Sequence, residues 1–254
     1  MKMINGMIAL VLFFTMPAFA QDDFVWPEKP KNIQVLDKSW PGSRLRAPMR
    51  GFQSALGVTC SYCHIGEEGK PLSTYDFASD ANPNKERARE MLRMLGSING
   101  HLDKIKPSGD KRVNMWCHTC HAGRPKPMTL AEDLGEHYRK GGIEASIVRY
   151  RELREQFYGK GGYDFGEGGL NSFGYQLLRG NDPEAAIRIF TMNAENFPNS
   201  PNVWGSLGEG YMKAGKMSMA ESSYRKVLNV DPGNKNAMEM LQKIKKTTKG
   251  DAKE

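Results

Sequence analysis

The chain has 254 residues, which is enough for one large domain or two ordinary ones. Apolar residues make up 39% of the chain, charged residues 26%, and the mean hydropathy is −0.59, values that exclude an integral membrane protein and a wholly disordered chain. The net charge of +7 predicts a solvated basic surface and no nucleic-acid partner, because no nucleic-acid motif accompanies it.

The first twenty residues have the features of a secretory signal peptide. Lys2 supplies a basic start, an apolar run extends from Ile8 to Phe14, and Ala18-Phe19-Ala20 fits a cleavage site. We expect cleavage after Ala20 and a periplasmic mature protein. The apolar run is short for a membrane anchor, and no later stretch is long and apolar enough to span a bilayer, so we expect no integral membrane segment after cleavage.

All four cysteines occur in one five-residue pattern that is used twice. The two copies are Cys60-Ser61-Tyr62-Cys63-His64 and Cys117-His118-Thr119-Cys120-His121. The pattern C-x-x-C-H is the attachment signature of a c-type haem. Two thiols one helical turn apart can bond to the vinyl groups on one edge of a porphyrin, and the adjacent histidine can bind the iron.

Disulfides or a zinc site are the alternatives for four cysteines in an exported chain. Neither explains a histidine after both pairs, and the two pairs lie farther apart than zinc-binding pairs usually do. Only 42 of the 120 residues from 21 to 140 are apolar, little for an all-protein core, and two porphyrins would supply the missing volume. We therefore predict two covalent c-type haems, in a domain at 21–140 that folds only with them. The predicted ligands are Cys60, Cys63, Cys117 and Cys120 for the porphyrins, and His64 and His121 for the irons.

The sixth ligand of the first iron decides whether that haem is a carrier or a catalyst. Met49 follows Pro48 and opens a short helical pattern, in which Met49, Phe52 and Leu56 share one face and Gly57 ends the helix. Such a helix could present the Met49 thioether to the iron. The alternative is that Met49 is a core residue, and spacing alone leaves both open.

The second iron has its candidate ligands on and after a helix predicted from Asn82 to Asn99. Asn82 can cap this helix, and Pro83 suits its first position. Its apolar stripe includes two methionines one turn apart, of which only one could bind the iron. The candidates are therefore Met91, Met94, His101 and His137.

These motifs resemble the haem-binding half of the tetrahaem cytochrome subunit of purple-bacterial photosynthetic reaction centres. The similar segments are Met49 through Gly57-Val58-Thr59-Cys60-Ser61-Tyr62-Cys63-His64, Tyr75-Asp76-Phe77-Ala78-Ser79-Asp80, Ala88-Arg89-Glu90-Met91-Leu92-Arg93-Met94 to Ile98-Asn99, and Cys117-His118-Thr119-Cys120-His121-Ala122-Gly123. The resemblance implies that Met49 binds the first iron and Met91 the second, with Met94 as a packing residue. The family's one histidine ligand would fall near Ile105 and is absent. Two motifs stand in place of four, so no photosynthetic role follows.

A different module is predicted after the second motif. Residues 141–166 are expected to form a linker, an amphipathic helix followed by a flexible glycine-rich joint from Gly159 to Gly169. A 34-residue period then resembles tetratricopeptide repeats. Its matched pairs are Gly174 with Gly208, Leu177 with Tyr211, Ala186 with Ala220, Phe190 with Tyr224, and Pro198 with Pro232.

The sequence therefore predicts a mainly α protein in two parts. A multihaem c-type cytochrome domain with little regular structure beyond short helices precedes an α-helical array of tetratricopeptide hairpins. The array spans 167–245, with repeats at 167–200 and 201–234, a capping helix from Asn236 to Lys245, and the linker helix completing the stack. A disordered tail is expected at 246–254.

Closed His/Met coordination at both irons predicts an electron-transfer protein with no catalytic residues, whose repeats dock a redox partner protein. One alternative is a dihaem peroxidase or reductase with one open iron. The other is a scaffold or assembly protein in which the repeats act and the haems are structural.

Overall fold

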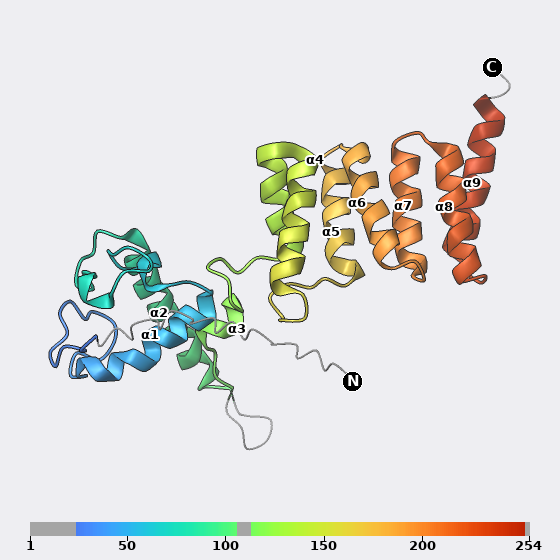
Figure 1. The fold of residues 1–254 in the computed structure, drawn as a ribbon. Coiled ribbons are helices and arrows are strands. Elements are labelled where there is room, and N and C mark those ends of the chain that lie inside the picture. Colours follow the sequence, from blue (N-terminus) through green and yellow to red (C-terminus); the bar gives the residue numbers. More distant parts are fainter. Residues whose placement is uncertain (1–23, 106–112, 252–254) are drawn as a thin grey trace, which may run out of the picture. The chain divides into compact units, whose positions relative to one another are not determined.

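The computed structural model describes residues 24–105 and 113–251, and the expected signal peptide lies outside them (Figure 1). The described residues form helices and no strand, apart from an isolated bridge between Ile65 and Asp76, which confirms the mainly α fold. The chain divides into two units, Met1–Gln53 with Val58–Met115, and Ser54–Gly57 with Trp116–Glu254. Among the helices described, none has the length and apolar character needed to cross a membrane.

The helix that carries Met49 is longer than the sequence indicates. α1 spans Gly42–Leu56, so Pro48 lies inside the helix, and the expectation that Met49 opens it is wrong. The helix begins at Gly42 because the N–H of Gly42 donates to the carbonyl oxygen of Pro27, at 3.0 Å, and a side chain here would clash with that oxygen. The predicted end is confirmed, since Gly57 follows α1 with φ of +64°.

The second long helix of the first unit begins as predicted. α2 spans Pro83–Leu102, and the side chain of Asn82 caps it by accepting a hydrogen bond from the N–H of Asn84, at 3.0 Å. Pro83 occupies the first helical position, where its missing N–H costs nothing. Between α1 and α2 the chain forms only two short 3-10 helices, Cys60–Tyr62 and Leu72–Thr74.

The second unit begins with the short helix α3 (Cys117–His121) and continues into α4 (Leu130–Phe157). Gly141 and Gly142 interrupt α4, with Gly142 at φ of +69° and ψ of −165°, a conformation that only glycine adopts readily. The two halves of α4 therefore fold back on each other. Across this hairpin, the Ser146 hydroxyl donates to the carbonyl oxygen of Leu134 at 2.9 Å.

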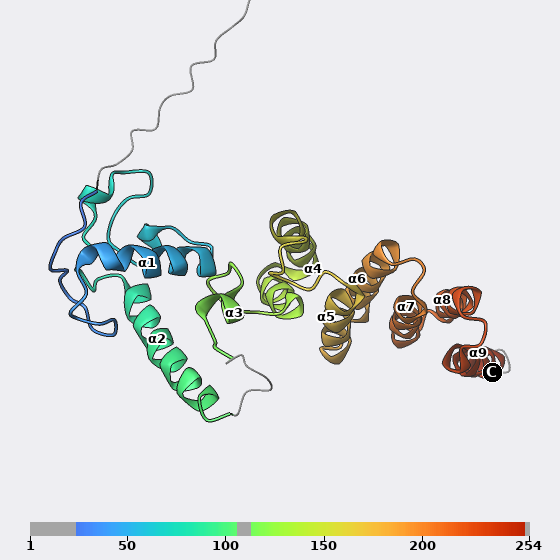
Figure 2. The ribbon, with the colours of Figure 1, turned by 90° about the horizontal axis from the view of Figure 1, so that it is seen from below.

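Five further helices follow α4 side by side (Figures 1 and 2). They are α5 (Glu167–Arg179), α6 (Pro183–Asn196), α7 (Pro201–Lys213), α8 (Met217–Val230) and α9 (Lys235–Asp251). The pairs α5–α6 and α7–α8 start 34 residues apart, which confirms both predicted repeats. A Cβ atom on Gly174 would stand 2.3 Å from the ring of Phe190, and one on Gly208 would stand 2.9 Å from the ring of Tyr224. The matched glycines thus let each helix pair pack closely.

The helical array starts earlier than the sequence indicates, and aromatic residues of the glycine-rich segment pack against its core. Both halves of α4 share one hydrophobic core with α5 and α6, so the array begins at Leu130 instead of at 167. The glycine-rich segment is a packed loop, because Phe165 is 8% exposed within this core. At the other end, Ala237 and Ile244 point inward from α9 as predicted, and α9 continues to Asp251 through most of the expected disordered tail.

Candidate haem-attachment sites

The first C-x-x-C-H motif is a tight turn at the end of α1. The N–H groups of Cys63 and His64 both donate to the carbonyl oxygen of Cys60, at 3.2 and 3.0 Å. The Gln53 side chain donates to the Cys60 sulfur at 3.3 Å. Burial raises the pKa of the Cys63 thiol, and the neighbouring Cys60 adds to the effect. The turn keeps the two thiols and the imidazole together, as haem attachment requires.

The imidazole of His64 is set against an ordered loop. Its ring lies edge-on to Phe77, with centroids 5.0 Å apart, and Nδ1 is buried with no hydrogen-bond partner. Lys85 fastens the loop by donating to the carbonyl oxygens of Phe77, Ala78 and Ser79 at 3.0, 2.9 and 2.8 Å. Burial and the Lys85 charge lower the pKa of His64, which favours the neutral imidazole that binds metals.

A buried guanidinium ties the same loop to α2. Arg89 is 7% exposed and donates to Asp80 at 2.9 Å and to Glu86 at 2.7 Å, with a third bond to the carbonyl oxygen of Asn32 at 3.3 Å. The Arg89 hydrogen bond, followed by that of Asn32, holds the pKa of Asp80 well below its usual range. The sequence motif around Tyr75 to Asp80 therefore has a structural role in holding Phe77 against His64.

The second motif forms α3 and presents its histidine differently. Nδ1 of His121 lies 2.8 Å from the carbonyl oxygen of Arg124, which leaves Nε2 free for a metal. Ala122 and Gly123 end α3 with positive φ of 47° and 82°. Burial raises the pKa of the Cys117 thiol. Each motif therefore offers two thiols and one imidazole, the donor set of a c-type haem.

The candidates for the distal ligands lie on three helices. Met49 is half-buried on α1, in the first unit with the first motif. Met91 and Met94 on α2 are 47% and 49% exposed, so their exposure does not indicate which of them binds the iron. His101 is exposed near the end of α2, whereas Nδ1 of His137 lies 2.9 Å from a main-chain carbonyl oxygen within α4. Ligation of the irons by Met49 and Met91 stays a prediction.

The described part of the first unit has apolar surface but almost no protein core. Leu45, 5% exposed, is its one buried hydrophobic side chain. Tyr62 within the first motif and Ile65 directly after it are 37% and 43% exposed, and no hydrophobic residue of α2 is buried. An amphipathic helix of 20 residues such as α2 needs an apolar partner against which its hydrophobic stripe can pack. The residues present therefore fit a porphyrin packed against this unit.

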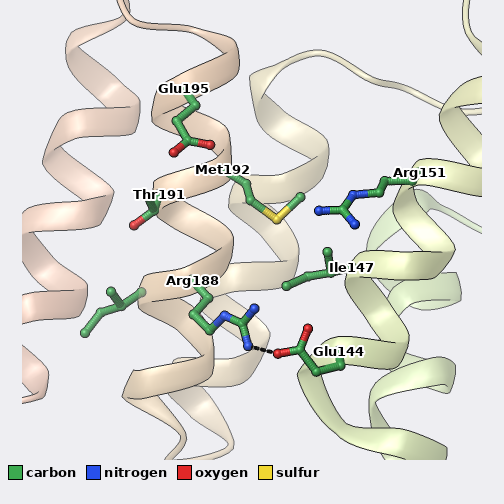
Figure 3. A pocket seen from close by; sticks show the side chains of 8 residues that line it. Glu144, Ile147, Arg151, Arg188, Thr191, Met192 and Glu195 are labelled. Atoms are coloured by element: carbon green, nitrogen blue, oxygen red, sulfur yellow. Dashed lines mark hydrogen bonds and ion pairs between the residues drawn. The ribbon is translucent and has the colours of Figure 1, made fainter.

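A groove on the helical array is a second kind of site, which the sequence analysis missed. It runs between the second half of α4 and α6, where Glu144 and Arg188 form an ion pair (Figure 3). Its lining residues are Glu144, Ile147, Arg151, Ile187, Arg188, Thr191, Met192 and Glu195. Neither helix alone carries a motif for it, since the groove exists only where the two helices pack.

Comparison with known proteins finds that the first part of the chain is similar to c-type cytochromes. Residues 28–147 match the family described as the photosynthetic reaction centre cytochrome C subunit, which confirms the resemblance of the motifs. Homology to this family suggests haem-based electron transfer, and the two C-x-x-C motifs are consistent with two haems.

Two curated relatives match about a third of the chain each. The chain is 34% identical over 95 residues to cytochrome c-554 of Chloroflexus aurantiacus, covering 37% of this chain and 20% of that protein. It is 32% identical over 97 residues to the photosynthetic reaction center cytochrome c subunit of Rubrivivax gelatinosus, covering 33% of this chain and 24% of that protein. The chain thus spans less than a quarter of the length of these relatives.

Solved structures, some of them tetratricopeptide domains, are similar to this chain at low identity. The first such domain of Spaghetti (RPAP3) bound to an HSP90 peptide has a TM-score of 0.34 and 16% identity, covering 47% of this chain and 90% of that one. PcrH from Pseudomonas aeruginosa has a TM-score of 0.31 and 16% identity, covering 45% and 92%. The assignment of the array rests on its own 34-residue period and helix pairs.

Proposed function

We propose that the protein is a periplasmic dihaem c-type cytochrome that carries electrons between redox partners. The observation that carries this proposal is the pair of C-x-x-C-H motifs inside a region similar to a cytochrome family, where the described residues of the first unit bury a single hydrophobic side chain. The haems, when bound, would each take up and release one electron at the iron. The periplasmic location rests on the signal sequence expected at residues 1–20 and cleaved after Ala20.

The chain's own residues would hold and enclose the two haems. The thiols of each motif would form the covalent attachment, and His64 and His121 would bind the irons through Nε2. Met49 is proposed as the distal ligand of the first iron and Met91 of the second. Thioether ligation raises the reduction potential, and a filled sixth position leaves no site for a substrate. Both consequences suit an electron carrier and not a haem enzyme.

The helical array would dock the redox partner. Its helix pairs present an extended surface with grooves, such as the one between α4 and α6, and its packing around a separate hydrophobic core suits a rigid docking platform. Adding residues 130–251 in excess should slow reduction of the full chain by a native periplasmic extract and leave reduction by ascorbate unchanged. Equal rates in the extract with and without this competitor would contradict docking by the array.

A matched pair of methionine variants tests the closed coordination at the second iron. Met91 and Met94 lie one turn apart on α2 with nearly equal exposure, so each controls for the other. We expect Met91→Ala to lose one of two ferric methionine–iron charge-transfer bands and to yield a high-spin haem that binds added ligands. We expect Met94→Ala to keep both bands.

Two outcomes would contradict parts of this proposal in distinguishable ways. Loss of the band in Met94→Ala alone would identify Met94, one turn further along α2, as the ligand of the second iron. The carrier function would then still hold. A wild-type protein with one high-spin iron that already binds added ligands would contradict an electron carrier with closed coordination, and would favour a peroxidase or reductase.

A further inference from the structure

Arg124 contacts the second motif through both its main chain and its side chain. Its carbonyl oxygen lies 2.8 Å from Nδ1 of His121, and its Nε donates back to the carbonyl oxygen of His121 at 3.2 Å. Its Nη1 also donates to the carbonyl oxygen of Met128. The orientation of the His121 ring therefore depends on where this one arginine is held.

The guanidinium of Arg124 rests on a tyrosine of the helical array. It lies 4.3 Å from the ring centroid of Tyr163, within the range of a cation–π contact. Tyr163 belongs to the packed loop between α4 and α5, and its ring meets that of Phe157 edge-on with centroids 5.4 Å apart. The platform beneath Arg124 is therefore part of the array's aromatic packing.

The Tyr163 hydroxyl is anchored in turn to both halves of α4. It donates to Oδ2 of Asp133 at 2.6 Å, and Asp133 is 6% exposed. Arg149, on the other half of the hairpin, donates to both oxygens of Asp133, at 2.9 and 3.3 Å. All these residues lie in the second unit, and Arg149 and Tyr163 lie beyond the family match at residues 28–147.

We propose that Arg124 and Tyr163 are positioning residues for the second haem, through which the helical array fixes the hydrogen bond at Nδ1 of His121. A hydrogen bond at this nitrogen makes the imidazole a stronger iron ligand, which favours the ferric state. His64 lies against Phe77 and not against Arg124, so the device acts on the second haem alone. This inference rests on the proposed function, since it concerns a haem bound at the second motif.

The test is redox titration of each haem in the holoprotein with substitutions at Tyr163. Tyr163→Leu removes the ring beneath Arg124 and should raise the potential of the second haem. Weakening one hydrogen bond changes the ferrous-to-ferric ratio about threefold, which is about 28 mV for a one-electron couple. Tyr163→Phe keeps the ring and should leave the potential near that of the wild type.

Tyr138→Leu is the matched control for loss of array stability. Tyr138 is also a partly buried tyrosine of the array that donates to a carboxylate, that of Asp182, but it does not touch Arg124. A shift confined to the second haem in Tyr163→Leu supports the inference. Equal shifts in Tyr138→Leu, a shift in both haems, or a Tyr163→Phe shift as large as that of Tyr163→Leu would overturn it. Failure of the proposed function would appear separately, as a wild-type protein without two covalent haems.

Discussion

Gly57 packs against Gly123, the second residue after the second C-x-x-C-H motif, and its replacement by alanine should strongly destabilise the holoprotein. Its φ of +64° costs an alanine about 1–2 kcal/mol. The new Cβ would stand 2.2 Å from the carbonyl oxygen of Gly123, so the backbone there must move. That movement breaks the hydrogen bond from the N–H of Gly123 to the carbonyl oxygen of Ala55, now 2.9 Å and contributing about 1 kcal/mol. The expected loss is about 3 kcal/mol.

Gly51→Ala on α1, the helix that Gly57 follows, is the control for this prediction. A Cβ at Gly51 meets nothing within 4 Å, so alanine there should be neutral or stabilise α1 by up to about 1 kcal/mol. Thermal unfolding followed by circular dichroism should place Gly57→Ala about 9 °C below the wild type. A Gly57→Ala protein that melts within 1 °C of the wild type would refute the close approach of Gly57 and Gly123.

Two further predictions concern the helical array. Gly174→Ala should lower the free energy of unfolding by about 2 kcal/mol, because its Cβ would stand 2.3 Å from the fully buried ring of Phe190. A Cβ at Gly205 meets nothing within 4 Å, so Gly205→Ala should raise the free energy of unfolding slightly. Urea titrations measure both changes. Burial alone would raise the pKa of Asp133, but the hydrogen bonds of Arg149 and Tyr163 keep it below 3.8. Asp133 therefore stabilises the fold above pH 3.8, and this contribution disappears as the pH falls further. Asp133→Asn should cost about 2 kcal/mol at neutral pH and flatten the acid limb of the stability curve, and an unchanged acid limb would contradict this role.

The repeats could be predicted from the sequence because their signals are local and recur. The 34-residue spacing of glycines, alanines and aromatics follows directly from the packing of one helix pair, and both predicted pairs are present. The cap of α2 by Asn82 and the end of α1 before Gly57 also depend only on neighbouring residues. Such features need no knowledge of the tertiary fold.

The first half of α4 was missed because its signals resemble those of a loop, whereas the second half was expected as the linker helix. Two glycines at 141 and 142 and many polar residues obscure the helix pattern, although Thr129 and Glu132 form a capping box that marks its start. The glycine-rich segment after α4 suggested flexibility, yet its aromatic side chains Tyr163 and Phe165 hold it in the core. Contacts between residues far apart in the sequence therefore determine the structure of both segments.

Around the haem motifs, some features could be predicted from the sequence and others could not. Cysteine and histidine spacing identifies the attachment sites, whereas the hydrogen bond between His121 and Arg124 depends on the turn after α3. The cation–π contact of Arg124 with Tyr163 joins residues far apart in the sequence and has no sequence signature. The choice between Met91 and Met94 depends on the haem itself.

The central claim is that each C-x-x-C-H motif carries a covalent haem. The most direct test is the intact mass of the denatured protein, made in a host with cytochrome c maturation machinery. We predict the mass of the chain from residue 21 plus two haems, with one haem lost in Cys60→Ser/Cys63→Ser and one in Cys117→Ser/Cys120→Ser. A chain mass without added haem in that host, or the mass of a disulfide-bonded chain, would contradict the claim.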